Sequence, residues 1–227
     1  MKYAKTLFGI SLATGMTALT LAAATPDPSF DRAEFDVTIT NVTRGQIFSP
    51  VLVASHSSDT SVFTPGEAAS AELAALAEEG NNMPLAMRLS QDANVADVES
   101  GSGVILPGTS ETIRITVTGK ADRISLAGML VNTNDAFVGL DSFQITRDPE
   151  TTVRALAYDA GTEFNSESCA FVPGPACGAS GAHDPTPAEG YVYVSNGVQG
   201  IGDLSPELYD WRNPAAIITI RRVRAGT

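Results

Sequence analysis

Alternating polar and apolar residues form the clearest pattern along this chain. The alternation runs through residues 34–42 and again through 111–118, with the two-residue period of a strand that buries one face. Six further runs are rich in β-branched or aromatic residues and are bounded by Gly, Pro, Asn or Asp: 50–56, 125–131, 137–145, 152–158, 190–195 and 215–223. These eight segments predict an all-β protein in which two antiparallel sheets pack as a sandwich.

A single segment has the pattern of a helix. Residues 64–67 read Thr-Pro-Gly-Glu, the form of a capping box with proline at the first helical position, and residues 68–79 are rich in Ala, Leu and Glu. Gly80 and Asn81 then end the run. Its apolar residues at helical spacing are Ala69, Leu73 and Leu76. We therefore predict one helix, inserted in a long loop and packed on the sandwich.

The N-terminus has the features of a secretory signal peptide. Lys2 and Lys5 precede an apolar run over 7–21, which small residues follow up to Ala24. We predict cleavage after Ala24, which removes residues 1–24 and leaves no membrane insertion. Residues 25–33 are then a short extended leader, and 34–227 form one β-sandwich domain. The protein is expected to be secreted or periplasmic, and monomeric.

The charge balance narrows the choice of partners. Removing the signal peptide takes the formal charge from −12 to −14 and leaves Lys120 as the one lysine beside eleven arginines. Such an acidic chain is a poor ligand for nucleic acid or anionic membranes, because phosphate contacts need clustered cations. Arg221, Arg222 and Arg224 form the one basic cluster, and we interpret them as solvated charges on an edge strand.

Two cysteines suit an exported protein. Cys169 and Cys177 flank a seven-residue segment, and oxidising compartments favour disulfides, so we predict a bridge between them that fixes the shape of a loop. The two cysteines and two histidines lack finger-like spacing, so a structural zinc site is not predicted.

Two acidic turns carry the candidate chemistry. Residues 134–139 and 158–163 each place carboxylates beside a glycine at a predicted strand end. Ca²⁺ takes about six to eight oxygens from carboxylates, carbonyls and water, and such loops supply all three. Asp and Asn are equally common in plain turns, where they bond to their own backbone. Spacing alone therefore leaves both interpretations open.

An ordered set of motifs resembles the spondin domain of F-spondin and its relatives. The motifs are 55–57 with 64–67 and the Ala/Leu/Glu helix, 125–135, 158–163, 197–204 and 209–214. The resemblance spans residues 35–223, which is nearly all of the chain after the signal peptide. Thrombospondin-type repeats, which accompany this domain in animal members, are absent from the sequence.

The resemblance implies a C2-like β-sandwich that binds one Ca²⁺ at its strand-end loops, with an adhesive or matrix-associated role. Asp135, Asp159 and Glu163 fall at the positions of the metal carboxylates in this family. Glu163 stands where the family motif has Asp, which adds one methylene and makes it the weakest of the three. Asp141 is a plausible additional carboxylate.

Two other functions remain open at this point. A carbohydrate-binding sandwich would use Trp211, Tyr191 or Tyr193 as stacking surfaces. A secreted hydrolase would use His56 or His183, with the arrangements on paper being Ser55, His56 and Asp59, or Ser180, His183 and Asp184. Neither histidine set has a nucleophile elbow or an oxyanion donor set. We therefore favour a non-enzymatic, calcium-binding adhesive module whose partner is an unidentified protein, matrix or glycan ligand.

Overall fold

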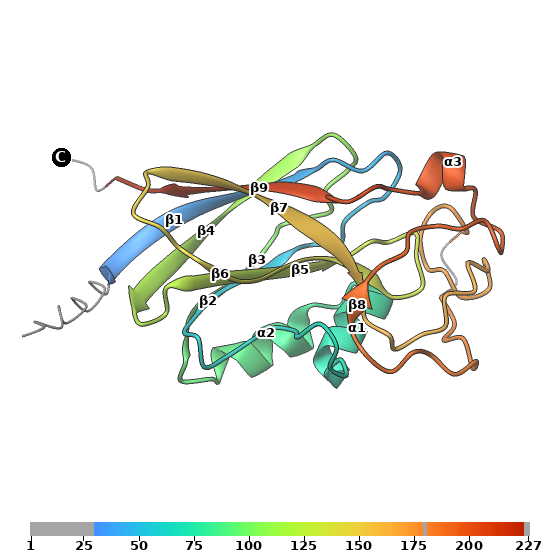
Figure 1. Ribbon diagram of the computed structural model, residues 1–227, viewed down its shortest axis with the longest axis horizontal. Coiled ribbons are helices and arrows are strands. Elements are labelled where there is room, and N and C mark those ends of the chain that lie inside the picture. The colour runs from blue at the N-terminus through green and yellow to red at the C-terminus, as the bar shows by residue number, and fades with distance from the viewer. Residues whose placement is uncertain (1–29, 179–180, 225–227) are drawn as a thin grey trace, which may run out of the picture.

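The computed structural model describes residues 30–178 and 181–224, and its nine strands are all antiparallel. The sheet order is β3-β2-β5-β6-β7-β9-β1-β4, with β8 added beside β7 (Figure 1). The strands are β1 (Phe30–Asn41), β2 (Leu52–His56), β3 (Val95–Ser100), β4 (Ser110–Gly119), β5 (Arg123–Met129), β6 (Ala136–Gln144), β7 (Glu150–Asp159), β8 (Tyr193–Val194) and β9 (Ala216–Arg222). The predicted all-β sandwich is confirmed. The predicted signal peptide lies outside the described residues.

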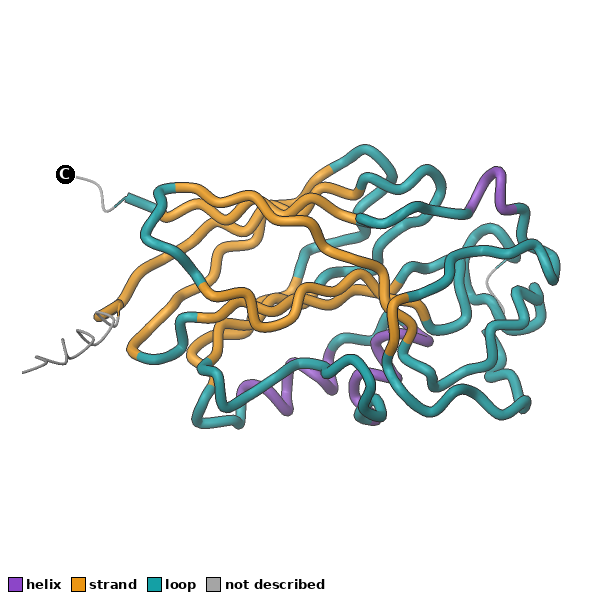
Figure 2. Tube along the Cα trace, viewed as in Figure 1, coloured by secondary structure: helices purple, strands orange, loops and turns teal. Residues whose placement is uncertain are grey.

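The sheet curls into two layers because β7 belongs to both of them. Its first part, residues 150–155, pairs with β9, whereas residues 156–159 pair with β6. At the opposite seam, Asp97 of β3 accepts the backbone N–H of Thr116 in β4 at 2.7 Å, and the hydroxyl of Ser55 donates to the carbonyl of Thr116 at 2.6 Å. Figure 2 shows the two strand layers, with loops gathered at one end.

The main hydrophobic core fills the space between the layers. The alternating pattern of β1 buries Phe35, Val37 and Ile39 there, with exposed fractions of 2% or less. The inward residues of β4 and β9 include Ile113, Ile115, Ile218 and Ile220, which meet them across the core. The period-two pattern of the sequence therefore identified the correct buried face of β1 and β4.

A second core lies on the outer face of one layer. Two helices in the connection between β2 and β3, α1 (Ala71–Glu79) and α2 (Met83–Ser90), cover that face (Figure 1). Their buried leucines are Leu73, Leu76, Leu85 and Leu89, and they pack with Phe63 and Phe137. Strand β2 is consequently buried on both faces, which explains the apolar run over residues 51–54.

Several element boundaries differ from the sequence expectation. Helix α1 starts at Ala71, and its N-cap is Ser70, whose hydroxyl accepts the N–H of Leu73 at 3.2 Å; the predicted cap at Thr64 was wrong. Gly80 ends α1, as predicted, and it adopts the left-handed conformation. The predicted strand 190–195 shortens to β8. Helix α2, strand β3 and the short α3 (Pro206–Tyr209) were not predicted.

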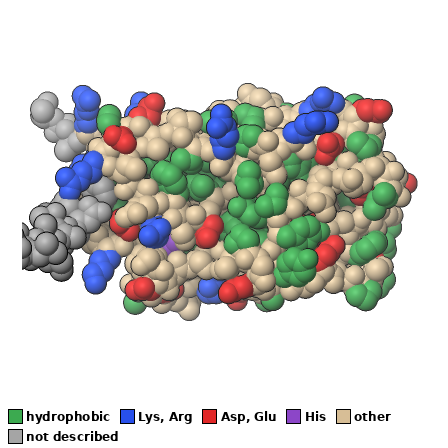
Figure 3. All heavy atoms as spheres, viewed as in Figure 1, with side chains coloured by type: hydrophobic (Ala, Val, Ile, Leu, Met, Phe, Trp, Pro, Cys, Tyr) green, Lys and Arg blue, Asp and Glu red, His purple; other side chains and the backbone are tan. Residues whose placement is uncertain are grey.

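Two further expectations concern the ends of the sandwich. Strand β1 starts at Phe30, so residues 30–33 of the predicted leader already pair with β4. The basic cluster at the end of β9 was wrongly assigned to an edge strand, because β9 lies between β7 and β1. Arg221 lies 3.5 Å from Asp36, and the exposed Arg222 and Arg224 line a surface hollow with Arg32 and Arg147. Figure 3 shows Lys and Arg side chains near the end of the molecule that carries the C-terminus.

No helix in the described ranges 30–178 and 181–224 has the length and apolar character needed to cross a membrane.

The change of N-cap gives a direct test of α1. We expect Ser70→Ala to lower the free energy of unfolding by about 1 kcal/mol, because the N–H of Leu73 loses its acceptor. Thr64→Ala is the matched control, since Thr64 lies outside the helix. We expect it to change the free energy of unfolding by no more than about 0.3 kcal/mol. Urea unfolding followed by circular dichroism measures both. A loss in Thr64→Ala with none in Ser70→Ala would contradict the assignment of Ser70 as the N-cap.

Candidate metal centre at the ends of β6 and β7

Strand pairing brings two of the predicted metal ligands together. Ala136, the first residue of β6, pairs with Asp159, the last residue of β7, so Asp135 lies directly beside the end of β7. Asp135 is fully buried and Asp159 is 1% exposed. The N–H of Ala160 also binds the carbonyl of Asp135 at 3.2 Å. Two buried aspartates, one just before β6 and one at the end of β7, therefore lie side by side.

The carboxylate of Asp135 organises the loop that follows β7. Its Oδ2 accepts the backbone N–H groups of Thr162 at 2.8 Å and Glu163 at 3.0 Å, together with the hydroxyl of Thr162 at 3.2 Å. Its Oδ1 is buried and has no hydrogen-bond partner. Buried carboxylate oxygens are normally satisfied, so this one is available to a ligand.

Asp159 forms the turn itself. Its Oδ1 accepts the N–H of Gly161 at 2.9 Å, and its Oδ2 accepts the side-chain amide of Asn165 at 2.7 Å. The same amide lies 3.1 Å from the hydroxyl of Tyr193. Gly161 has φ +66°, and a Cβ there would run into the backbone of Tyr191. Glycine at 161 is therefore required by both conformation and space.

The pKa values of both aspartates are raised at this strand end. Burial and the neighbouring charge of Asp159 raise the pKa of Asp135 to about 8. Burial also raises the pKa of Asp159 to about 6, although hydrogen bonds from Asn165 and Gly161 oppose the shift. Neither forms an ion pair with Lys or Arg within the part of the chain that the structure describes. A bound cation would remove this penalty.

Glu163, the third predicted ligand, divides its contacts between two places. Its backbone N–H binds Asp135, but its carboxylate Oε1 accepts the N–H of Asp184 at 2.7 Å. Its carboxylate lies with Glu78 and His183, and one ligand atom from each lies within 4.8 Å of the others. Burial and the charge of Glu78 raise the pKa of Glu163. The structure therefore contains a group of acidic and histidine side chains that could hold a metal ion.

Asp141 lies apart from this centre. It is six residues further along β6 than Asp135, which at the strand rise corresponds to about 20 Å. Its carboxylate accepts the hydroxyl of Ser142 at 3.1 Å, and the charges of His56 and Arg123 act on it. We therefore leave Asp141 out of the candidate site.

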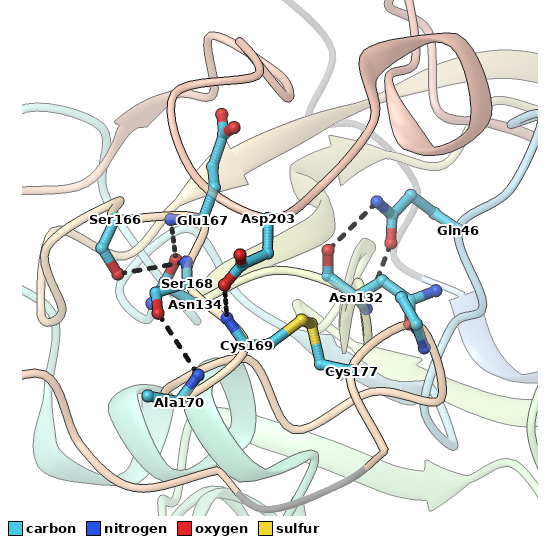
Figure 4. The surroundings of a disulfide bond; sticks show 11 residues. Gln46, Asn132, Asn134, Ser166, Glu167, Ser168, Cys169, Ala170, Cys177 and Asp203 are labelled. Atoms are coloured by element: carbon cyan, nitrogen blue, oxygen red, sulfur yellow. Dashed lines mark hydrogen bonds between the residues drawn. A yellow bond between two sulfur atoms is a disulfide. The ribbon is translucent and has the colours of Figure 1, made fainter.

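Polar side chains of the segment before β6 hold the long loop that follows the site. Asn132 Oδ1 accepts the N–H of Ala176 at 3.0 Å, and Asn134 Oδ1 accepts the N–H of Glu167 at 3.2 Å. Together with Asp135, they bind three successive parts of the chain after β7. Figure 4 shows Asn132 and Asn134 with the loop around the disulfide.

Glu167 is a further buried carboxylate, and it accepts backbone N–H groups of a distant loop. It is 6% exposed, and its carboxylate accepts the backbone N–H groups of Gln199, of Gly200 at 2.7 Å and of Ile201 at 2.9 Å. Its carbonyl accepts the N–H of Asp203 at 2.8 Å. Glu167 thereby joins the loop after β7 to the loop before α3.

The predicted disulfide is confirmed. Cys169 and Cys177 are bonded, with an S–S distance of 2.05 Å. The N–H of Cys169 donates to the carboxylate of Asp203 at 2.8 Å (Figure 4). The bridge therefore adds to the polar contacts that fix this loop.

The first arrangement considered for a hydrolase, Ser55 with His56 and Asp59, does not assemble. His56 is fully buried, and its ring nitrogens contact the carbonyl of Ser57 at 2.8 Å and the hydroxyl of Ser125 at 2.7 Å. Ser55 donates instead to Thr116. Of the second arrangement, Ser180 lies outside the described residues.

The aromatic residues considered for carbohydrate binding lie in different settings. Trp211 is 7% exposed and belongs to the main core, so it offers no stacking platform. Tyr191 is 47% exposed, and its ring centre lies 5.6 Å from that of Tyr193.

Sequence reasoning missed three residues of this region: Glu78, Asn165 and Glu167. Glu78 was assigned only to a packed helix, and its position beside Glu163 follows from the placement of α1 on the sheet. Asn165 and Glu167 follow the acidic turn closely, so their proximity to it was the one signal that could have drawn attention to them.

Residues 39–171 match the Spondin_N family. The match covers more than half of the chain, and the chain belongs to this family. A search of curated proteins found no match. The spondin domain and the disulfide point to an extracellular protein, and the family is generally not enzymatic.

The raised pKa values predict how stability depends on pH without metal. An unfolded Asp has a pKa of about 3.9, so between pH 4 and 8 these two aspartates bind more protons in the folded protein than in the unfolded chain, and their contribution to stability falls as pH rises. Asp135→Asn removes one of these charges. In the presence of a chelator, we expect its advantage over wild type to grow with pH to about 1–3 kcal/mol at pH 8. Urea unfolding at several pH values measures the difference, and a difference independent of pH would contradict the pKa assignment.

The contacts of Glu167 predict a local and a global effect. Glu167→Gln replaces a charged acceptor of three N–H groups by one that can use a single oxygen, so we expect a loss of about 2 kcal/mol in unfolding free energy. Hydrogen exchange at residues 199–201 should accelerate beyond this global effect. Glu79→Gln, on an exposed part of α1, is the control. Unchanged exchange at 199–201 would show that the carboxylate does not hold this loop.

Proposed function

We propose that this protein is an exported, non-enzymatic spondin module that binds Ca²⁺ at Asp135 and Asp159 and attaches to a protein, matrix or cell-surface partner. The observation that carries the calcium assignment is the buried carboxylate pair at the joined ends of β6 and β7. One oxygen of this pair, Asp135 Oδ1, is buried without a partner.

The donor set suits a hard cation. Asp135 and Asp159 offer carboxylate oxygens, and the turn after β7 adds backbone carbonyls in the same region, which are the ligand types that Ca²⁺ takes. No Lys or Arg within residues 30–178 and 181–224 forms an ion pair with either aspartate, so the repulsion between them is left for a cation to neutralise. Glu163 has its carboxylate with Glu78 and His183, so the proposed site depends mainly on the two aspartates.

Bound calcium would act as a brace, not as a reagent. It would cancel the charge repulsion at the strand ends and so stabilise the loops that Asp135 and Asp159 hold. These loops, the disulfide segment and α3 gather at the end of the sandwich opposite the C-terminus (Figure 1). Surface loops on a rigid sandwich are a common location for binding sites, and this end is where we place the partner surface.

The signal-like N-terminus supports export, and the disulfide suits an oxidising compartment. The acidic composition makes nucleic acid an unsuitable partner. Adhesion is the role that the family resemblance implies, and no arrangement of His56 with neighbouring hydroxyls offers an accessible nucleophile.

Calcium titration of the purified protein by isothermal calorimetry tests the metal assignment. We expect one ion per chain, bound in the range of about 0.1–1 mM that extracellular modules show. Asp135→Asn and Asp159→Asn should each weaken binding at least tenfold, because each removes a charged ligand. Asp141→Asn is the matched control, on the same strand as the site but remote from it, and should bind as wild type does.

Two outcomes would contradict the proposal. One is no heat of binding and no rise in melting temperature at about 5 mM Ca²⁺, well above the range for extracellular modules. The other is wild-type affinity in both aspartate variants.

A further inference from the structure

Glu78, Glu163 and His183 converge from three separate parts of the chain. Glu78 lies in the last turn of α1, Glu163 in the loop after β7, and His183 in the long loop beyond the disulfide. One ligand atom from each lies within 4.8 Å of the other two. Their burial grades from the interior outward: Glu163 is 2% exposed, the side chain of Glu78 19% and that of His183 58%. The group therefore opens to solvent on one side.

Each side chain is held in place by contacts of its own segment. Glu78 follows the buried Leu76 and Ala77, and Gly80 ends the helix in the left-handed conformation. Glu163 is fixed at both ends, because its N–H binds Asp135 and its Oε1 accepts the N–H of Asp184. Contacts that orient the ligands in this way are typical of metal sites.

Asp184 also holds the segment that carries His183. It is 3% exposed, and its carboxylate accepts the N–H of Thr186 at 2.9 Å, which forms a tight turn directly after the histidine. The backbone N–H of Asp184 donates to the carboxylate of Glu163 at 2.7 Å. The position of His183 relative to Glu163 is thus set by the adjoining backbone, although the imidazole itself is exposed.

The donor types differ from those of a calcium site. One imidazole nitrogen and two carboxylate oxygens suit zinc and related first-row ions, whereas Ca²⁺ prefers oxygen alone. Zinc bonds of about 2.0–2.1 Å at tetrahedral angles place neighbouring ligand atoms about 3.3 Å apart. The separation between His183 Nδ1 and Glu78 Oε2 is 3.3 Å. Three protein ligands would leave one position for water.

A simple ion pair between His183 and Glu78 would give the same separation. It would leave unbalanced the second negative charge of the buried Glu163 carboxylate, which lies within 4.8 Å of these ligand atoms. Among the described residues, neither Glu78 nor Glu163 forms an ion pair with Lys or Arg. A divalent cation would satisfy both carboxylates at once.

We propose that Glu78, Glu163 and His183 bind a divalent transition-metal ion of the zinc class, at a site distinct from that of Ca²⁺. The ion ties the end of α1 to the loops that carry Glu163 and His183, and so locks the long loop onto the helical face of the sandwich. The site stands independently of calcium binding, because its ligands include neither Asp135 nor Asp159.

Zinc titration of the purified protein, produced without a histidine tag and stripped of metal, tests the site by calorimetry. We expect one Zn²⁺ per chain and at least a tenfold loss of affinity in His183→Ala and in Glu78→Gln. Glu163→Asp should also weaken binding at least tenfold, because the shorter side chain withdraws its carboxylate from the group. Glu79→Gln, an exposed neighbour on the same helix, should bind zinc as wild type does.

Paired measurements keep the two metals apart. Asp159→Asn should retain zinc affinity, and His183→Ala should retain whatever calcium affinity the wild type has. Each metal site is therefore tested independently, even if the protein does not bind the other metal. Circular dichroism confirms that each variant is folded; His183 and Glu79 are exposed, and their substitution disturbs no core contact. Absence of zinc binding by the wild type, or wild-type zinc affinity in folded His183→Ala, would overturn the proposal.

Discussion

The buried carboxylate of Asp135 accepts two backbone N–H groups, and the loop end of the sandwich depends on this interaction. It joins the start of β6 to the loop after β7, and the pairing of Ala136 with Asp159 completes the junction. One oxygen of Asp135 accepts structural hydrogen bonds, whereas the other is buried and unpaired. The same carboxylate thus holds the loop and keeps an oxygen available for a ligand, although buried oxygens are usually paired. The cost of burying this charge beside Asp159 is what a bound cation would offset in the proposed calcium site.

The same design continues along the chain. The loop between β7 and α3 buries few large apolar side chains, and it is held by polar contacts to Asn132, Asn134 and Glu167 and by the disulfide. Such contacts fix the loop backbone precisely, and they leave its outer surface free to vary. A rigid sandwich with a polar-braced loop end is a suitable scaffold for adhesion, because ordering the loops in advance reduces the entropy lost on binding.

Sequence patterns predicted the parts of the fold that depend on local rules. The alternation in β1 and β4, the glycine at 80 and the nearby cysteines each reflect a constraint that acts over a few residues. Helix α2 and strand β3 were missed, since α2 is stabilised by burying Leu85 and Leu89 on the sheet, and β3 is an edge strand with acidic residues. The family motifs paired Asp135 with Asp159. The direction of the Glu163 side chain could not be predicted, because it depends on Glu78 and His183, which are 105 positions apart.

Calcium binding by Asp135 and Asp159 is the central claim, and a crystal structure of the protein grown with millimolar Ca²⁺ tests it most directly. Anomalous scattering identifies the ion and its position. We expect one calcium peak at the end of β6 and β7, about 2.3–2.6 Å from Asp135 Oδ1 and from a carboxylate oxygen of Asp159. A structure in which water alone lies between the two carboxylates, or in which calcium is bound elsewhere, would contradict the account.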